Sequence, residues 1–218
     1  HFTVFDEDMA KEVEETINFL EDNKIPYCLI DRDMFDIGKY KISVDHLQGA
    51  YLATEHLINL GHKKIGCITG PLILDDARQR LAGYKQALKD NGIKIDENLI
   101  FEGDYSFEKG KIGCDNLLAK NITAVFAAND FSAMGALASI KEHNLIVPRD
   151  ISIVGYDDIA FASLLEVPIT KVRQPIDAIG QKATEVINQL VNSEENIDSK
   201  IIILEPKLIV RSSTKAIS

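Results

Sequence analysis

The chain has 218 residues, of which 45% are hydrophobic, so it is long enough for one large or two small domains with a packed core. No apolar run reaches the roughly 18 residues of a membrane-spanning helix, and no signal peptide is visible at the start. The formal net charge of −10 argues against a domain that grips nucleic-acid phosphates by itself. Cys28, Cys67 and Cys114 are scattered, as expected of buried thiols in a reducing cytosol.

Helix and strand patterns alternate along the chain. In chain order we expect a helix over 6–23, strands over 25–30 and 41–44, a helix over 48–60, a strand over 64–69, a helix over 76–91, a strand over 99–103, a helix over 106–119, a strand over 124–127, a helix over 132–143, strands over 151–154 and 169–172, a helix over 176–191, and strands over 201–204 and 207–210. Gly61 and Gly92 follow two of the helices, where glycine is the favoured C-terminal cap. This alternation predicts an α/β fold of parallel sheets with helices on both faces.

The segment 147–158 contains the strongest candidate for a binding residue. A short β-branched run, typical of a strand buried in a parallel sheet, leads to Gly155, Asp157 and Asp158. We expect Gly155 to bend the chain sharply, so that the carboxylates face a crevice. Ligands of open α/β sheets bind at the carboxyl ends of the strands. Asp157 is therefore a candidate ligand contact, while one of the two aspartates is expected to serve a turn or a cap.

Three further candidates follow other strands. Arg80 lies on the helix after a Gly-Pro turn, where it can fork two donors onto hydroxyls or a carboxylate, or else lie on the surface. Asn129 and Asp130 follow the strand 124–127; one of them is expected to cap the next helix, which leaves the other for the crevice. Gln174 is either a loop residue or a ligand contact at a crossover.

Enzyme chemistry finds little support in the sequence. His46, His56, His62 and His143 form no metal-ligand set, and we expect them to be structural or exposed. No nucleotide phosphate loop and no nucleophile elbow occurs, so neither a cofactor nor a metal is indicated.

The order of several landmarks resembles the effector-binding domain of the LacI/GalR family of bacterial transcription regulators. The landmarks are Gly61-His62-Lys63-Lys64-Ile65-Gly66, Gly70-Pro71, Arg80-Leu81-Ala82-Gly83-Tyr84, Thr123 to Asp130, Ala133-Met134-Gly135-Ala136, Val147 to Asp158, Thr170 to Pro175, and Leu208 to Thr214.

The resemblance implies two Rossmann-like subdomains, as in periplasmic sugar-binding proteins, with the effector between them. It implies crossings near Val44, Gln174 and Pro206, so that residues 1–44 and 174–205 form a partial N-terminal subdomain and residues 45–173 and 206–218 the C-terminal one. The positions matching the family's ligand contacts are Arg80, Asn129, Asp157 and Gln174.

The same resemblance indicates the class of ligand. The combination of Arg, Asn and Asp is similar to sugar-responsive members, and Leu74 stands where purine-responsive members carry a basic residue. Phe131 and Phe161 are expected to give an apolar wall for the C–H face of a sugar ring.

Family members carry a helix-turn-helix headpiece and a hinge helix, and we expect both, with the first βα units of the N-terminal subdomain, to lie outside this chain. Family members are homodimers, and Met134, Leu164 and Leu165 are candidates for that interface, with ordinary core packing as the alternative. The sequence thus predicts the cytoplasmic, allosteric sugar sensor of a repressor that performs no reaction. The alternatives are a solute-binding protein of a sugar transporter, disfavoured by the 211–214 pattern, and, more weakly, a nucleotide-using enzyme.

Overall fold

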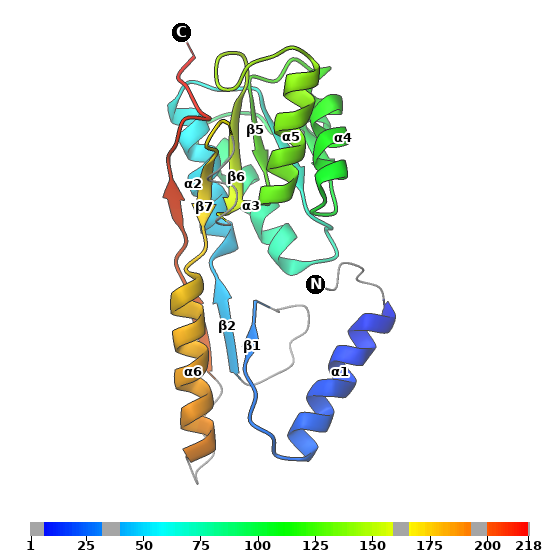
Figure 1. Ribbon diagram of the computed structural model, residues 1–218, viewed down its shortest axis with the longest axis vertical. Helices are drawn as coiled ribbons and strands as arrows, with labels where there is room; N and C mark the ends of the chain where they lie inside the picture. Colours follow the sequence, from blue (N-terminus) through cyan, green and yellow to red (C-terminus); the bar gives the residue numbers. More distant parts are fainter. Residues whose placement is uncertain (1–6, 32–39, 159–165, 193–199, 218) are drawn as a thin grey trace.

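The computed structural model describes residues 7–31, 40–158, 166–192 and 200–217, which form two sheets (Figure 1). The smaller sheet has the order β1-β2-β8, with all strands parallel: β1 (Leu29–Ile30), β2 (Tyr40–Val44) and β8 (Lys200–Leu204). The larger sheet has the order β4-β3-β5-β6-β7-β9. Its strands are β3 (Ile65–Thr69), β4 (Ile100–Glu102), β5 (Ala124–Ala127), β6 (Ser152–Asp157), β7 (Thr170–Arg173) and β9 (Lys207–Ile209). The α/β class is confirmed, except that β9 pairs antiparallel with β7.

Helices cover both faces of the larger sheet, as the alternation of elements predicts. On one face α2 (His46–Asn59) packs on α3 (Asp75–Asp90), and on the other α4 (Phe107–Leu118) packs on α5 (Asp130–Glu142). The short 3-10 helix η1 (Glu97–Leu99) precedes β4. The smaller sheet is covered by α6 (Ile176–Asn192), and α1 (Glu7–Asp22) precedes β1. No helix of the described ranges is long and apolar enough to cross a membrane.

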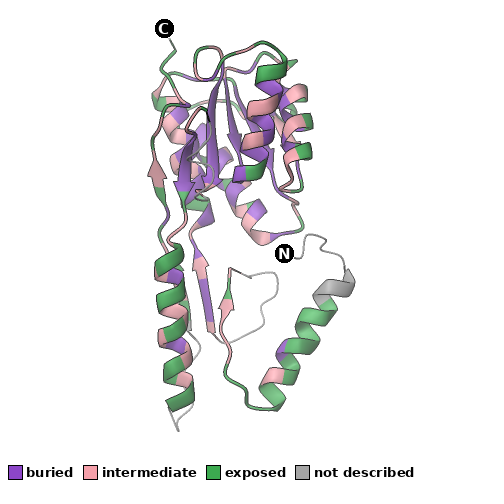
Figure 2. Cartoon of the chain, viewed as in Figure 1, coloured by how far each residue is buried: buried purple, intermediate pink, exposed green. Residues whose placement is uncertain are grey.

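The larger sheet is buried on both faces (Figure 2). Every residue of β3 and β5 is buried, which explains why these strands read as short continuous apolar runs. One core lies under α4 and α5 and the other under α2 and α3, where Phe126 and Tyr156 are fully buried. Both faces are therefore closed, and only the ends of the strands are open to a ligand.

Two glycines behave as the sequence predicts, and one does not. Gly61 and Gly92 have φ of +91° and +69°, the left-handed conformation that ends a helix. The sharp bend expected at Gly155 is wrong, because β6 continues through it to Asp157. Gly155 marks a close approach of two elements instead, since a Cβ there would lie 3.1 Å from the Cβ of Ala133 on α5. The turn comes later, at Asp157 and Asp158, with φ of 93° and 66°.

The chain passes between the two sheets three times: between β2 and β3, between β7 and β8, and between β8 and β9. The larger sheet directs the carboxyl ends of β5 and β6 toward the smaller one (Figure 1). The subdomain boundaries at residues 44, 174 and 206 stay a prediction, because the sheets assign strands and not the residues between them.

Candidate functional site

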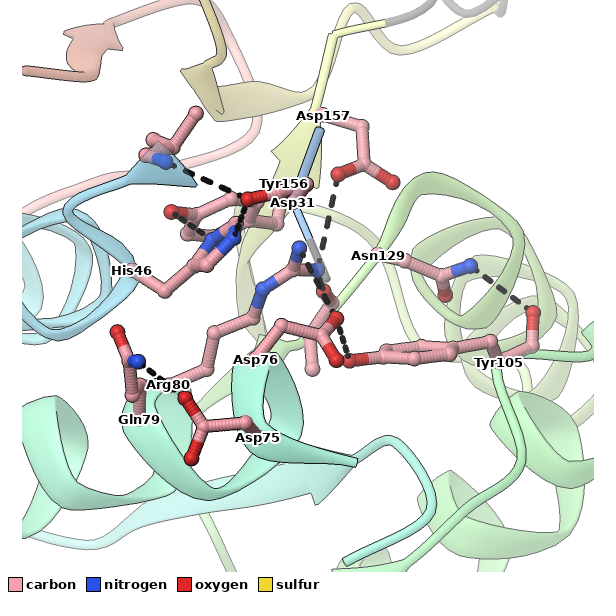
Figure 3. Close-up of polar contacts among 12 residues, drawn as sticks. Asp31, His46, Asp75, Asp76, Gln79, Arg80, Tyr105, Asn129, Tyr156 and Asp157 are labelled. Atoms are coloured by element: carbon pink, nitrogen blue, oxygen red, sulfur yellow. Dashed lines mark hydrogen bonds and ion pairs between the residues drawn. The ribbon is translucent and has the colours of Figure 1, made fainter. Parts of the chain in front are cut away.

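Arg80 lies at the centre of a polar cluster at the end of the larger sheet (Figure 3). Its side chain is 5% exposed and extends from α3 toward β6, so the surface alternative is wrong. The guanidinium lies between two carboxylates, with Asp76 Oδ2 at 3.4 Å and Asp157 Oδ1 at 3.6 Å. One of its nitrogens donates to the carbonyl of Ala128, just after β5. The ring of Tyr156 lies 4.0 Å from the guanidinium carbon, at cation–π distance.

The groups around Arg80 keep its guanidinium protonated. Burial by itself would lower the pKa of Arg80, but the nearby tyrosines and the carboxylates of Asp157 and Asp76 outweigh burial and raise that pKa. Tyr105 joins the same group by donating its hydroxyl to Asp76 Oδ2 at 2.7 Å. Burial raises the pKa of Tyr105 well above its usual value, so its hydroxyl remains a donor at neutral pH. The cluster is thus a preorganised set of charged and hydrogen-bonding groups.

Of the two candidate residues that follow β5, Asn129 is the one that caps the next helix. Its side-chain oxygen accepts from the backbone nitrogen of Ser132 at 2.9 Å, which caps α5. Its Nδ2 donates to the carbonyl of Tyr105 at 2.9 Å, which ties the cap to the Arg80 cluster. Asp130 is buried instead and forms an ion pair with the fully buried Lys171 of β7.

The two aspartates after β6 have different partners. Asp157 Oδ1 accepts a hydrogen bond from Gln174 Nε2 at 2.7 Å. Two predicted ligand contacts, one before β7 in the chain and one directly after it, therefore meet here. Asp158 binds Arg173 at 2.6 Å and Arg211 at 2.7 Å. Burial tends to raise the pKa of Asp158, but these hydrogen bonds and charges hold it below its usual range. The two ion pairs of Asp158 therefore hold β7 against the C-terminal segment.

A further group at this site was missed by the sequence analysis. His46, expected to be structural or exposed, is 1% exposed, with Nε2 2.8 Å from Asp31 Oδ1 and Nδ1 3.2 Å from the hydroxyl of Tyr156. Asp31 also accepts from the backbone nitrogen of Val44 at 3.3 Å. Asp31 follows β1 as Asp157 ends β6, so the same strand-end rule could have found it. His46 thus connects the carboxylate of the smaller sheet to the tyrosine that stacks on Arg80.

The remaining predicted contacts are less well defined. Phe131, in the first turn of α5 and two residues from Asn129, is 51% exposed. Met134 is half-buried in α5, while Phe161, Leu164 and Leu165 lie outside the described residues. A cavity of about 150 Å³ lies between the smaller sheet and α3, and among its lining residues are Lys41, Asp45 and Gln79.

His62, Cys67 and Cys114 follow the sequence analysis, whereas Cys28, expected to be buried, is only partly so. His62 is buried and contacts Thr123 Oγ1 at 2.9 Å and Ser152 Oγ at 3.1 Å, which is a structural role. Cys67 and Cys114 are buried, and burial raises the pKa of Cys114 to about 12. Within the described ranges no three His, Cys, Asp or Glu side chains gather as metal ligands do.

Comparisons with known proteins show which family this chain is similar to. A model of the "periplasmic binding protein-like domain" matches residues 54–214. The ribose operon repressor of Haemophilus influenzae is 38% identical over 192 residues, which are 87% of this chain and 57% of the repressor. The transcriptional repressor PurR of Vibrio atlanticus is 32% identical over 213 residues, 97% of this chain and 63% of PurR. The chain therefore spans about three fifths of the length of these relatives.

A solved structure agrees with the sequence relatives. The LacI family transcriptional regulator from Enterococcus faecium with bound ribose superposes with a TM-score of 0.86 at 27% identity, covering 94% of this chain and 76% of that one. The match covers both sheets and not only the larger one, because it includes nearly the whole chain. This chain belongs to the periplasmic-binding-protein-like, effector-binding domains of the LacI/GalR family of regulators.

Proposed function

We propose that this chain is the effector-sensing part of a sugar-responsive transcriptional repressor. It binds a small sugar between its two sheets and performs no reaction itself. Operator DNA is bound by a helix-turn-helix headpiece belonging to the same regulator. The observation that carries the proposal is the cluster around Arg80, in which one guanidinium, two carboxylates and two carboxamides converge at the ends of β5, β6 and β7.

The chemistry of this cluster suits a polyol. Arginine donates to two hydroxyl oxygens in one plane, carboxylates accept from hydroxyl hydrogens, and a carboxamide does both. We assign Arg80, Asn129, Asp157 and Gln174 as ligand contacts on this ground. The half-exposed ring of Phe131 offers an apolar face beside Asn129 for the C–H side of a sugar ring.

The likeness to other regulators supports a sugar and points to one to test first. One relative is a ribose operon repressor, and one structural neighbour holds ribose. The similarity to PurR makes purines the competing class of effector. A repressor of this family works in the cytoplasm as a homodimer, and we keep Met134, Leu164 and Leu165 as the proposed contacts of its C-terminal half.

The effector acts by favouring one arrangement of the two sheets. A ligand bridging Asp31 and the Arg80 cluster binds the closed arrangement better than the open one, and this difference in affinity drives the change. A coupling free energy of about 1–3 kcal/mol is sufficient for such control. The hydrogen bonds of His46 already connect the two sides in the described structure.

A thermal-shift panel tests this function. The protein is heated with pentoses, hexoses and purine bases, each in large excess, and any ligand that binds the folded state raises the melting temperature. We expect at least one neutral sugar to raise it, and calorimetry on that sugar then gives the affinity. A rise with purines alone would replace the sugar sensor by a purine sensor, and no rise with either class would overturn the proposal.

A further inference from the structure

The charges at the site do not balance. Arg80 contributes one positive charge and His46, 2.8 Å from Asp31, at most a second, while the carboxylates of Asp31, Asp76 and Asp157 contribute three negative ones. The side chains of these three carboxylates are 24–28% exposed, so a ligand that enters meets them directly. Figure 3 shows them arranged on different sides of the guanidinium. The described side chains at the site are therefore net negative.

Among the described residues, the arginines around the site are already engaged. Arg78 donates to the carbonyls of Leu72 and Ile73 and pairs with Asp75 at 3.0 Å. Arg173 and Arg211 both bind Asp158. Recruiting one of these groups for a phosphate would break bonds that it makes in the protein.

Two lysines are also placed unfavourably for an anion at Arg80. Lys171 is fully buried against Asp130, behind the strand end that carries Asp157. Lys41 is buried and lines the neighbouring cavity, where Asp45 also lies. Phosphate-binding sites use arginine forks, lysines or free helix N-termini to match the charge of the ligand. The N-terminus of α5 is capped by Asn129 and followed by Asp130.

Resting on the function proposed above, we propose that this site takes an uncharged polyhydroxyl effector and rejects phosphorylated sugars. The guanidinium of Arg80 lies between carboxylates on α3 and β6, so groups of the protein itself already neutralise its positive charge. A sugar hydroxyl can donate to Asp31, Asp76 or Asp157 and accept from Arg80 without any uncompensated charge. A phosphate dianion at the same place meets carboxylates at close range, and like charges in contact strongly oppose binding.

The test compares matched pairs of ligands on the wild-type protein. Calorimetry is run with D-ribose and D-ribose 5-phosphate, and with D-glucose and D-glucose 6-phosphate, at low and high salt. We expect the free sugar of the binding pair to bind at least about tenfold more tightly than its phosphate ester. Raising the salt concentration should narrow the gap, because it screens the repulsion of the ester and leaves the neutral sugar unaffected.

A variant and its matched control identify the source of the discrimination. Asp76→Asn keeps an oxygen to accept from Tyr105 but removes one negative charge, so the preference for the free sugar should fall several-fold. Asp75→Asn removes the same charge one residue earlier, where the side chain faces Arg78 and Gln79, and should change the preference less. A similar fall in both variants would mean that general charge and not the site sets the preference.

The outcomes separate this inference from the proposed function. Tighter binding of an ester than of its free sugar overturns the neutral-effector inference and leaves a sugar sensor in place. Binding of neither member of any sugar pair, in the panel above and here, overturns both. Tighter binding of the free sugar, with a gap that shrinks in Asp76→Asn, supports the inference.

Discussion

The larger and the smaller sheet are built from similar βα units, but they differ in how much apolar surface they close. The larger sheet has a core on each face, under α2 and α3 on one side and under α4 and α5 on the other. Around the smaller sheet the buried core consists of Ile42, Val44 and Ile179, within the described ranges. Ile201 and Ile203 of β8 remain 66% and 63% exposed.

This difference bears on how firmly each part of the molecule is held. Segments with few buried apolar contacts open at a lower free energy than closed cores. The larger sheet therefore holds Arg80, Asn129 and Asp157 on a closed core, whereas the smaller sheet, carrying Asp31, buries less apolar surface in the described part of this chain. A sensor needs both properties, a preformed half-site and a second half whose position the ligand can change.

Breaking the interior of the larger unit should have the largest effect. Lys171→Met leaves Asp130 without its buried cation, and we expect the free energy of unfolding to fall by about 3–5 kcal/mol. Urea denaturation monitored by circular dichroism measures this change. Lys85→Met is the matched control, because Lys85 pairs with a well-exposed Glu97 and its loss should cost less than about 1 kcal/mol. Equal costs for the two variants would contradict the idea of a rigid, ion-paired interior.

Removing the carboxylate that we propose as a ligand contact should have the next largest effect, on binding more than on folding. Asp157→Ala removes the acceptor of Gln174 and one partner of Arg80, so we expect sugar affinity to weaken by more than about 2 kcal/mol. Calorimetry with the best sugar of the panel gives the value. Asp75→Ala serves as the control, and unchanged affinity in Asp157→Ala would remove this residue from the site.

The connection between the two units should depend on pH. Burial tends to raise the pKa of Asp31, but the hydrogen bond and charge of His46 and the amide of Val44 outweigh it, so this pKa lies below its usual value. A depressed carboxyl pKa stabilises the fold above the unfolded-state pKa of about 3.9, and the stabilisation is lost as the pH falls through the folded-state pKa. Asp31→Asn should therefore cost about 1 kcal/mol at pH 7 and nearly nothing once wild-type Asp31 is protonated.

Parallel urea titrations at neutral and acidic pH test that dependence. Asp22→Asn, at an exposed position of α1, is the control and should show no such difference between the two conditions. A cost for Asp31→Asn that stays constant with pH would mean that the charge of Asp31 does not contribute to the connection between the units.

The smallest effect is expected on the outside of the smaller unit. Lys182 and Glu185 form an exposed pair at 2.6 Å on α6, and such helix pairs contribute about 0.2–0.5 kcal/mol. Lys182→Ala should therefore shift the melting temperature by no more than a few degrees. A larger shift would show that α6 depends on its surface charges because its buried face is small, which would sharpen the contrast between the two units.

The sequence predicted the larger unit better than the site as a whole. Strands such as 124–127 are short apolar runs between helix patterns, and polar residues at their ends follow a general rule of open sheets, which is how Asn129 and Asp157 became candidates. Arg80 was singled out instead by its place on the helix after the Gly-Pro turn. The contact between His46 and Tyr156 joins residues 110 apart and depends on how α2 lies on β6. No local pattern carries that information, and the same holds for Tyr105 and Asp76.

The bend expected at Gly155 failed for a related reason. A glycine in a strand can mark either a turn or a close approach of another element, and a single sequence does not distinguish the two. Here the approach of Ala133 on α5 decides it, and the turn falls on two aspartates whose left-handed conformation is uncommon without glycine.

Asn129 has a consequence for how the proposed binding site can evolve. One amide group both begins α5 and anchors the loop of Tyr105, so a change of ligand preference made at this position is also a change to the fold. Aspartate would keep the oxygen that caps the helix and lose the donor, whereas alanine would lose both. New specificities should therefore be reached more readily through exposed neighbours such as Phe131, and the asparagine itself should be among the last positions to vary.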